Sequence, residues 1–317
     1  MDFLAVAILV ALLFDLLLGD PQWMPHPIRW IGKTIDWLEP ILTRRFSASK
    51  MGGIVLTVLI VGATYLLSWG LIWGSFQIHF LCGVGVSTLL LYTCFAAYDL
   101  DKQSRKVYNK IKKGNLDQAR IQLSMIVGRD TMSLTEEDIS RAAVETVAEN
   151  TVDGILAPLF FAVLGGAPLA LAFKAASTLD SMVGHQTEKY RDFGWASTKL
   201  NHGLNWAPAQ IARFVYPLAA FICRLDAILC WRIAWRDGRK SPSPHSGLSE
   251  AAFAGALQVQ LGGENRYQGE TQTRPLLGDP LQELTAEKIP QAINMMYLST
   301  ALMVALLISV RLIISQN

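Results

Sequence analysis

The sequence has few charged residues and an almost balanced charge. Of its 317 residues, 17% are charged and 51% are hydrophobic, whereas soluble domains average about 25% charged residues. The net charge of +2 lacks the basic excess of a nucleic-acid-binding domain, so we expect no nucleic-acid partner. This composition argues against an ordinary soluble domain and predicts a protein that exposes apolar surface to lipid.

Several familiar motifs are also missing. The four cysteines lie in apolar segments without C-x-x-C spacing, which favours buried thiols over zinc ligands or disulfides. There is no G-x-x-x-x-G-K-[ST] phosphate loop, and no G-x-G-x-x-G follows a predicted strand. Asp2 stands where a signal peptide has a cation, and no small-residue cleavage site precedes Asp20. We therefore expect residues 1–18 to remain as a membrane helix.

Long apolar runs supply the membrane-crossing segments, because a helix needs about 20 apolar residues to cross the hydrocarbon core. Gly52–Gly74, Phe76–Ala97 and Ala292–Ile314 meet this length with almost no charge. Met1–Leu18 nearly meets it, while Gly154–Phe173 and Ala207–Trp231 are weaker because Pro or Arg interrupts them. The predicted fold is an all-α, polytopic integral membrane bundle of about five to six spans.

Basic residues indicate which loops face the cytoplasm. They concentrate in residues 19–51 and 98–153, so we place both regions in the cytoplasm, Met1 outside, and the protein in the bacterial inner membrane. Residues 98–153 are predicted to form a helical cytoplasmic insertion. Thr135 and Asp138 resemble a capping box that starts its last helix.

The run Gly165-Gly166-Ala167-Pro168 is predicted to end this helix. Either residues 154–173 cross the membrane once, which places 174–205 outside, or they form a re-entrant hairpin, which keeps 174–205 in the cytoplasm. A hairpin requires a protein-lined or wet cavity around its turn. The predicted segments are spans at 1–97, the insertion at 98–153, broken membrane segments at 154–235, a polar loop at 236–291 and a last span at 292–317.

Glu145, Glu149 and Asp153 are spaced at i, i+4 and i+8 and share one helix face, with Asn150 beside them. Carboxylates suit Mg²⁺, which binds one or two of them together with substrate phosphates. The alternative is a solvated face in which Arg141 pairs with Glu145. Because an apolar segment follows at once, the acids stand at the membrane entrance and we favour a functional role.

Other blocks offer the polar or charged side chains that a site needs. They are the loop with Asp20, His26 and Arg29; the glycine turn with Arg129 and Asp130; the helix face with Lys174, Ser177, Asp180, Ser181 and His185; the Ser- and Pro-rich segment with His245; and the Gly-rich segment with Asn265 and Tyr267. The Gly-rich segment can bring backbone N–H groups to an anion. Each block also has a structural interpretation, as a turn, a helix end or close helix packing.

Together these blocks resemble the CobD/CbiB family, the adenosylcobinamide-phosphate synthases of cobalamin biosynthesis. The resemblance spans nearly the whole chain and keeps the order of the blocks. It is carried by Gly19-Asp20-Pro21 with Pro25-His26-Pro27, Val127 to Thr131, Glu145 to Gly154 with Ala157-Pro158, Thr178 to His185, Phe193-Gly194, Asn205-Trp206 with Pro208-Ala209, and Leu261-Gly262-Gly263 with Asn265, Tyr267 and Gly269.

The resemblance implies an amide ligase. The family joins (R)-1-amino-2-propanol, or its O-phosphate, to the propionate of adenosylcobyric acid and consumes ATP. Activating a carboxylate needs Mg²⁺ on the nucleotide, cations on the developing charge and a base for the ammonium. We expect ATP and Mg²⁺ as cofactors and the corrinoid and the amine as substrates. The expected partners are the lipid bilayer, other membrane enzymes of nucleotide-loop assembly, or a second copy of the chain.

The roles that we assign are hypotheses from residue chemistry. The catalytic candidates are His26, Glu145, Asp180 and His185, and the metal candidates are Glu145, Glu149, Asp153 and Asp180. The substrate- and phosphate-binding candidates are Asp20, Arg29, Arg129, Asp130, Asn150, Lys174, Ser177, Ser181, Asn205, Asn265 and Tyr267.

The chain departs from the pattern of the family at several positions. Asn201 and His202 stand where two adjacent Asp are usual, Gln210 stands in place of an Arg, and His245 in place of an Asn. Either the Asp pair is dispensable or this chain has drifted in substrate or activity.

Two other classes of protein remain as alternatives. An intramembrane prenyltransferase also holds Mg²⁺-diphosphate with Asn and Asp residues such as Asn150 and Asp153, but it needs a second Asp-rich motif that Asn201-His202 does not supply. A transporter or membrane assembly factor is the non-enzymatic alternative, since broken helices occur in transporters. The sequence shows no inverted repeat in support of it.

Overall fold

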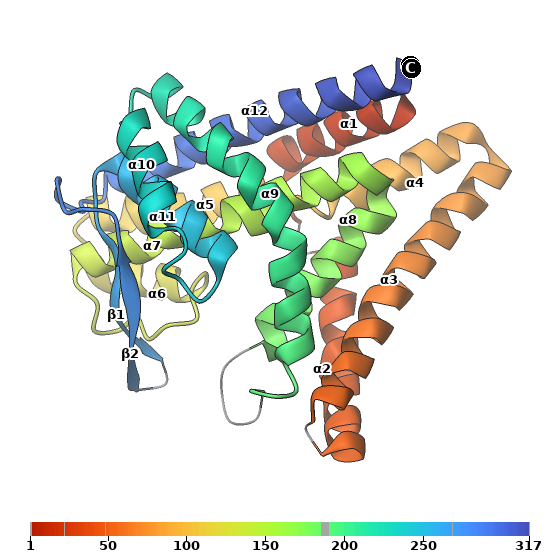
Figure 1. Ribbon diagram of the computed structural model, residues 1–317, viewed down its shortest axis with the longest axis horizontal. Coiled ribbons are helices and arrows are strands. Elements are labelled where there is room, and N and C mark those ends of the chain that lie inside the picture. The colour runs from red at the N-terminus through yellow and green to blue at the C-terminus, as the bar shows by residue number, and fades with distance from the viewer. Residues whose placement is uncertain (1, 22, 48, 185–189, 268, 317) are drawn as a thin grey trace. The chain divides into compact units, whose positions relative to one another are not determined.

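The computed structural model describes residues 2–21, 23–47, 49–184, 190–267 and 269–316. Within them the chain forms helices α1 to α12, a π-helical turn and a two-stranded sheet (Figure 1). The chain groups into two compact units, each assembled from separate stretches of sequence. Unit 1 comprises Met1–Ala96, Ala157–Asn205 and Leu306–Asn317, and unit 2 comprises Ala97–Leu156 and Trp206–Ala305.

Unit 1 contains most of the strongly apolar helices. They are α1 (Phe3–Leu18), α2 (Pro27–Phe46), α3 (Lys50–Ile78), α4 (Phe80–Tyr92), α8 (Ala157–Val183), the first part of α9 (Trp195–Ile222) and the end of α12 (Lys288–Gln316). α8 packs against α1, α2, α3 and α4. Ile35, Leu56 and Leu179 from α2, α3 and α8 are almost fully buried in its core. As predicted, almost no loop separates α3 from α4, because His79 alone joins them and its ring caps α4.

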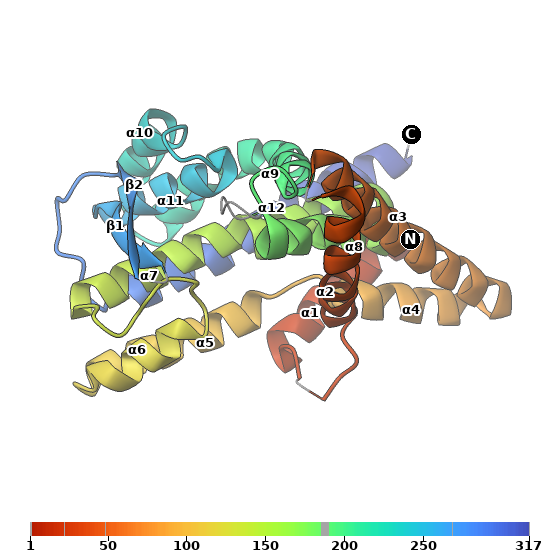
Figure 2. The same cartoon turned by 90° about the horizontal axis from the view of Figure 1, so that it is seen from below.

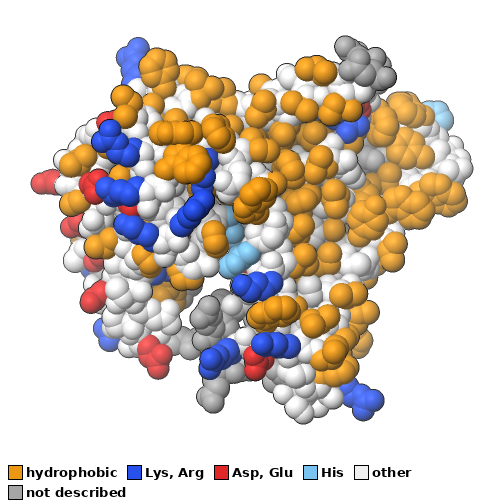
Figure 3. All heavy atoms as spheres, in the orientation of Figure 1, with side chains coloured by type: hydrophobic (Ala, Val, Ile, Leu, Met, Phe, Trp, Pro, Cys, Tyr) orange, Lys and Arg blue, Asp and Glu red, His pale blue; other side chains and the backbone are white. Residues whose placement is uncertain are grey.

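Four helical segments are long and apolar enough to cross a membrane: Lys50–Ile78, Phe80–Lys112, Glu136–Val183 and Lys288–Ile314. α1 is a shorter apolar helix. Large apolar side chains stay exposed along α3, and hydrophobic side chains cover its visible face in Figure 3. Such a surface fits lipid, so the predicted helical membrane architecture is confirmed. The weaker candidate Ala207–Trp231 is not one of the four segments, because α9 ends at Ile222 and a new helix starts at Ala227.

α8 folds back on itself at Gly165 and Gly166. Both residues have non-helical dihedral angles, and the φ of 68° at Gly166 is one that side-chain-bearing residues rarely adopt. Phe161 and Phe173 lie on opposite sides of this break, yet their rings stack with centroids 5.1 Å apart. A straight helix would separate them by about 18 Å along its axis. Of the two alternatives for residues 154–173, the hairpin therefore describes the local chain path.

A residue of α12 donates a hydrogen bond to the Val163 carbonyl, just before the break. Arg311 Nη1 donates to the Val163 carbonyl at 2.7 Å, and Arg311 Nε lies 2.5 Å from Asp2 Oδ2. Asp2 also caps α1 by accepting from the Leu4 N–H. This arrangement matters because lipid offers no water to a free carbonyl.

Unit 2 is built around α7. Its elements are α5 (Ala97–Lys112), α6 (Leu116–Ser124), α7 (Glu136–Thr151), the π-helical turn η1 (Val152–Leu156), the rest of α9, α10 (Ala227–Asp237), α11 (Pro244–Leu257), β1 (Leu261–Tyr267), β2 (Glu270–Leu277) and most of α12. α7 lies between the α5–α6 pair and α11 (Figure 2). Thr135 and Asp138 form the predicted capping box at its start.

The Gly-rich segment forms an antiparallel hairpin and not the loop that the sequence predicts. Asn265 on β1 faces Gln272 on β2, and an irregularity in register lies between Leu261 and Gly263. At this irregularity a Cβ on Gly262 would lie 2.1 Å from the Pro275 carbonyl oxygen, and its φ is 86°. Only glycine fits there, and the close approach directs the Gly262 N–H toward α7.

Candidate functional site

The face of α7 that carries Glu145 is buried rather than solvated. Glu145 is 2% exposed. Its Oε2 accepts a hydrogen bond from Arg129, and its Oε1 accepts one from the Gly262 N–H at 2.8 Å. Arg129 also donates to Asn265 Oδ1 at 2.8 Å. The structure thus brings together candidates from the glycine turn, α7 and the Gly-rich segment.

Two further contacts attach the hairpin to this part of unit 2. Asp130 Oδ2 accepts from the Gly269 N–H at 2.8 Å. Arg141 donates to the Gly262 carbonyl and to Asp138, the latter at 2.9 Å. The alternative of an Arg141–Glu145 pair on a solvated face is therefore wrong. The Arg141 side chain instead binds Gly262 of the hairpin and Asp138 in the first turn of α7.

The helix changes form just after Glu149. The π-helical turn η1 alters the helical repeat, so Asp153 does not continue the i, i+4, i+8 line that the sequence suggested. Asp153 Oδ1 instead lies 3.4 Å from His245 Nε2 at the start of α11, and the His245 side chain is 4% exposed. Such π-helical turns are frequent at functional sites.

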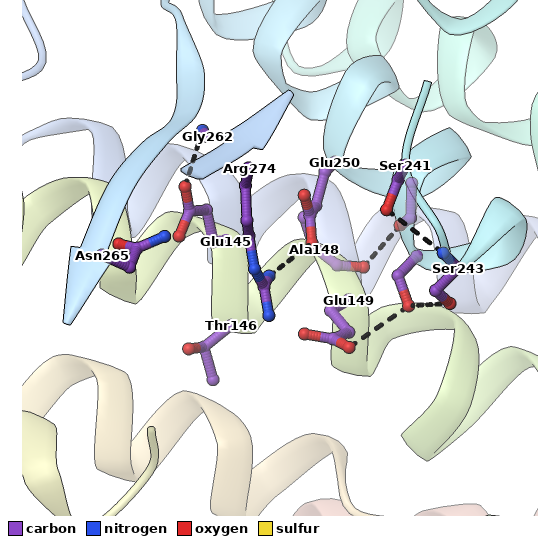
Figure 4. Close-up of polar contacts among 12 residues, drawn as sticks. Glu145, Thr146, Ala148, Glu149, Ser241, Ser243, Glu250, Gly262, Asn265 and Arg274 are labelled. Carbon is purple, nitrogen blue, oxygen red and sulfur yellow. Dashed lines mark hydrogen bonds and ion pairs between the residues drawn. The ribbon is translucent and has the colours of Figure 1, made fainter. Parts of the chain in front are cut away.

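Glu149, Glu250 and Arg274 come from three different elements and meet between α7, α11 and β2 (Figure 4). Glu149 Oε1 accepts from Ser246 Oγ at 3.2 Å. Arg274 Nη1 lies 3.9 Å from Glu250 Oε1, and Glu250 is 4% exposed. Figure 4 shows the Arg274 side chain reaching into the space beside Glu145, Glu149 and Glu250.

Glu250 and Arg274 lie outside the candidate membrane spans, and burial and neighbouring charges shift the pKa values of both. Burial, reinforced by Glu149 and Glu145, raises the pKa of Glu250 well above its ordinary value. Burial acting alone would lower the pKa of Arg274, but Tyr267 and the three glutamates raise it. Arg274 therefore stays charged and is the nearest cation available to Glu250.

We call this group the acid-rich cluster; it consists of Glu145, Glu149, Asp153, Glu250, Arg129, Arg274 and His245. Glu145 is paired with Arg129 and Asp153 lies beside His245, so Glu149 and Glu250 share Arg274. Within the described chain, no three His, Cys, Asp or Glu side chains form a group able to hold a metal by themselves. An excess of buried negative charge suits a cationic group brought by a ligand.

Glu149 and Asp153 are the members that fit a ligand-bridged Mg²⁺. Mg²⁺ usually takes one or two carboxylates and completes its shell with phosphate and water. Asp153 Oδ1 is buried, lies 3.4 Å from His245 Nε2 and has no hydrogen-bond partner among the described residues. In contrast, Arg129 and Gly262 engage both oxygens of Glu145, so Glu145 is held as an anchor in this arrangement.

Asp180 belongs to a separate polar group in unit 1. It accepts from Thr198 Oγ1 at 2.6 Å and from Asn201 Nδ2 at 2.8 Å. Asn205 Nδ2 donates to Asn201 Oδ1 at 3.0 Å, and Asn205 is fully buried. Asn201 thus donates to a carboxylate from a position where the family pattern has Asp. The metal role of Asp180 stays a prediction.

The loop after α1 brings its three candidates together in unit 1. Asp20 Oδ2 lies 3.4 Å from both His26 Nε2 and Arg29 Nη2, and His26 is 8% exposed. The loop is therefore a compact acid–base group, as its composition predicted. Its catalytic role is a prediction.

The hydroxyl groups of α8 point back to their own helix. Ser181 Oγ donates to the Ser177 carbonyl, and Thr178 Oγ1 donates to the Lys174 carbonyl. Asn150 on α7 does the same through Nδ2. These hydrogen bonds favour the structural interpretation of the hydroxyls. His185 lies outside the described residues.

Sequence reasoning missed Glu250 and Arg274, and it named His245 without assigning it a role. A usable signal exists for Glu250, because every residue from His245 to Leu257 is buried and most of that run is small or apolar. A helix that is apolar all round is buried, so its single acid is buried too. Arg274 gives no such signal, since only the pairing of β1 and β2 places it.

A cleft of about 560 Å³ opens at the start of α7 in unit 2. It is lined by residues from the start of α7, by Gln260 and Gly262, and by the segment from Leu276 to Leu284. Gly262 connects the cleft with the acid-rich cluster, because its N–H binds Glu145. The cleft has room for a small molecule.

Fold and site together define a multi-pass helical membrane protein with a buried, acid-rich cluster between three elements of unit 2. The chain belongs to the CobD/CbiB family, since the sequence profile described as CobD/Cbib protein matches residues 8–296. The resemblance seen in the sequence blocks is therefore confirmed.

Three curated relatives match over nearly their whole length. The chain is 48% identical over 299 residues to the cobalamin biosynthesis protein CobD of Geobacter metallireducens, covering 94% of both chains. It is 44% identical over 305 residues to the cobalamin biosynthesis protein CbiB of Salmonella typhimurium, covering 95% of this chain and 96% of the relative. It is 43% identical over 307 residues to CobD of Photorhabdus laumondii, covering 96% of both. No solved structure matches the chain.

Proposed function

We propose that the protein is an ATP-dependent amide ligase of cobalamin biosynthesis. It would couple (R)-1-amino-2-propanol, or its O-phosphate, to the propionate of adenosylcobyric acid. Family membership supports the pathway. The observation that carries the chemistry is the acid-rich cluster, in which the buried Glu149 and Glu250 share one arginine and Asp153 lies beside His245.

The reaction requires a carboxylate to become an acyl donor. The propionate oxygen attacks the γ-phosphorus of ATP, which forms an acyl phosphate and releases ADP. The amine nitrogen then attacks the acyl carbon, and inorganic phosphate leaves with the electron pair of the broken C–O bond. The ammonium must give up its protons to a base and to water before and during this attack.

The members of the cluster suit these tasks. Arg274 would neutralise the anionic oxygens of the propionate and the phosphate. Glu250 would accept a hydrogen bond from the ammonium through its carbonyl oxygen, and His245, 3.4 Å from Asp153, would accept its proton. Glu145 would hold Arg129 and Gly262 in place and so keep the hairpin against α7.

Glu149 and Asp153 would hold Mg²⁺ together with the nucleotide phosphates. When bound, the ion supplies positive charge to the phosphoryl oxygens. The cleft beside Gly262 would admit the amine. We place the site on the cytoplasmic side of the inner membrane, where ATP is present. The family match gives the prenyltransferase and transporter alternatives no support.

Replacing one glutamate tests the proposal. Glu149→Gln in the full-length protein should lower ATP-dependent formation of adenosylcobinamide or its phosphate by about a hundredfold, the upper end of the effect of losing a group that supports a metal site. The matched control is Glu136→Gln, which changes an exposed glutamate in the first turn of the same helix. Normal ligation by the Glu149→Gln protein would exclude Glu149 from the chemistry.

A growth experiment tests the pathway step independently of any residue. Deletion of the gene should create a requirement that cobinamide meets and cobyric acid does not. Growth of the deletion strain on cobyric acid alone would remove the ligase proposal, whatever the variants show.

A further inference from the structure

Arg213, on the part of α9 that belongs to unit 2, is a buried cation without a counter-ion. It is 5% exposed, and its buried Nε has no hydrogen-bond partner. Its guanidinium carbon lies 4.0 Å from the centroid of the Trp235 ring on α10. Within the described part of the chain, that ring is its one close polar or aromatic contact. A buried charge that lacks a partner is costly, so the site is suited to an anion from outside the chain.

The charges around Arg213 do not compensate it. Burial lowers the pKa of Arg213, and Arg239 lowers it further. Asp237 is the nearby acid on α10, but Arg236 and Lys240 already bind it. Hydrogen bonds from these two side chains and from the Gly278 N–H outweigh burial and hold the pKa of Asp237 at about 2.

The stretch from 206 to 240 is basic as a whole. It contains Arg213, Arg224, Arg232, Arg236, Arg239 and Lys240 but only Asp226 and Asp237. Asp226 is also engaged, because it caps α10 by accepting from the Leu229 N–H at 2.8 Å. Folding adds one acid to this stretch, because Asp279 binds Arg236, and an excess of basic side chains remains.

An exposed aromatic ladder adjoins the buried arginine. The rings of Phe214 and Trp231 lie 5.3 Å apart, and those of Trp231 and Trp235 lie 5.6 Å apart. Phe221 and Ile228 extend this apolar surface and are 71% and 72% exposed. Figure 3 shows hydrophobic and basic side chains interleaved over α10 and the adjoining part of α9. Trp beside Arg is typical of a membrane–water interface.

We propose that α9 and α10 bind an anionic phospholipid, with the phosphodiester headgroup at Arg213 and Arg239 and an acyl chain along Phe214, Trp231 and Trp235. The charge complementarity explains why a buried arginine is left unpaired. The ladder favours a lipid as the ligand, since an acyl chain can pack against exposed aromatic rings and a free phosphate cannot. The proposal goes beyond the ligase reaction, because none of these residues belongs to the acid-rich cluster.

Lipid retention by the full-length protein tests the proposal. The protein is placed in nanodiscs of phosphatidylglycerol or phosphatidylcholine, and the lipid that stays bound after release into detergent is counted by native mass spectrometry. We expect retention of phosphatidylglycerol to exceed that of phosphatidylcholine by about tenfold, the factor that a charge-assisted hydrogen bond supplies. In the Arg213→Gln protein this preference should disappear.

Arg224→Gln is the matched control, because it removes an exposed arginine from the same basic stretch without touching the ladder. It should keep the preference for phosphatidylglycerol. A thermal scan in lipid-free detergent then separates binding from folding. Arg213→Gln removes an unpaired buried charge, so this protein should unfold at the same or a higher temperature than the wild type. Phosphatidylglycerol should raise the unfolding temperature of the wild type and of Arg224→Gln, but not that of Arg213→Gln.

Three outcomes would overturn the proposal. One is equal retention of the two lipids by the wild-type protein, a comparison that needs no variant. Another is an undiminished preference in the Arg213→Gln protein. The third is displacement of phosphatidylglycerol from the wild type by millimolar inorganic phosphate, which would mark the site as one for soluble phosphate.

Discussion

Glu250 shows how strongly position governs the chemistry of a single residue here. It is the one acid of the buried helix α11, with Glu149 and Glu145 nearby, Arg274 as its ion-pair partner and a weaker contribution from Arg129. Its raised pKa means that the folded protein binds a proton at this carboxyl more tightly than the unfolded chain does. The stability gained from that proton is complete below about pH 4.5 and is lost as the pH rises toward the raised pKa.

Glu250→Gln should therefore flatten the pH dependence of stability. The wild-type protein should lose thermal stability as the pH rises from about 4.5 toward the raised pKa of Glu250, and the variant should lose less, because the amide keeps the neutral form at every pH. Thermal unfolding of both proteins in the same detergent measures the difference. Glu264→Gln on β1, where the side chain is exposed, should follow the wild type. An equal loss of thermal stability with rising pH in all three proteins would show that Glu250 does not cause the pH dependence.

About half of the side chains of the acid-rich cluster could be identified from the sequence. Glu145 and Glu149 share a helix face, and helical spacing is visible in a sequence, whereas the π-helical turn that moves Asp153 off this line is not. Arg129 and Asn265 were named from turn and glycine chemistry, although their contact spans 136 residues. Arg274 could not be found, because a cation on a strand is ordinary until the strand pairing places it beside Glu250.

Among the elements, those with local signals were predicted well and those that depend on distant contacts were not. The capping box at Thr135 and the break at Gly165 follow from neighbouring residues, and both are present. The π-helical turn and the β-hairpin were not predicted. The hairpin depends on Gly262 lying against Pro275, and a glycine-rich run by itself favours a loop as much as a strand.

Gly166→Ala should destabilise the fold through the backbone of α8 alone. The nearest atom to an added Cβ is 3.6 Å away, so no collision occurs, but the φ of 68° is unfavourable for alanine. The expected loss is about 1–2 kcal/mol, seen as a lower unfolding temperature. Gly70→Ala on α3 is the control, because nothing lies within 4 Å of its added Cβ and alanine favours helix. Equal effects of the two substitutions would contradict a left-handed turn at Gly166.

On the scale of the whole molecule, the division into two units has no counterpart in the order of the sequence. Each unit collects stretches from early and late parts of the chain. The hydropathy pattern reveals the spans because lipid acts on each helix separately. It cannot reveal which spans associate, because the apolar faces of α1, α3 and α8 are similar in composition and specific packing decides among them.

Membrane sidedness can be tested with exposed positions of unit 2. Lys113 and Glu270 belong to one compact unit, so both should lie on one side, and the basic residues around Lys113 assign that side to the cytoplasm. In a Cys82→Ser background, Lys113→Cys and Glu270→Cys should react with an impermeant maleimide only after the inner membrane is opened. Gln77→Cys, beside the α3–α4 turn, should react in intact cells. Labelling of Glu270→Cys in intact cells would contradict the assignment.

The contact of Arg311 with Asp2 and Val163 bears on how the chain is made. The first helix leaves the ribosome early and the α8 break follows midway, whereas the donor for that break follows 148 residues after the carbonyl that it binds. Until Arg311 is made, the Val163 carbonyl lacks this donor. We therefore expect a chain that stops before Arg311 to leave unit 1 incomplete at the break in α8, however well its earlier helices have formed.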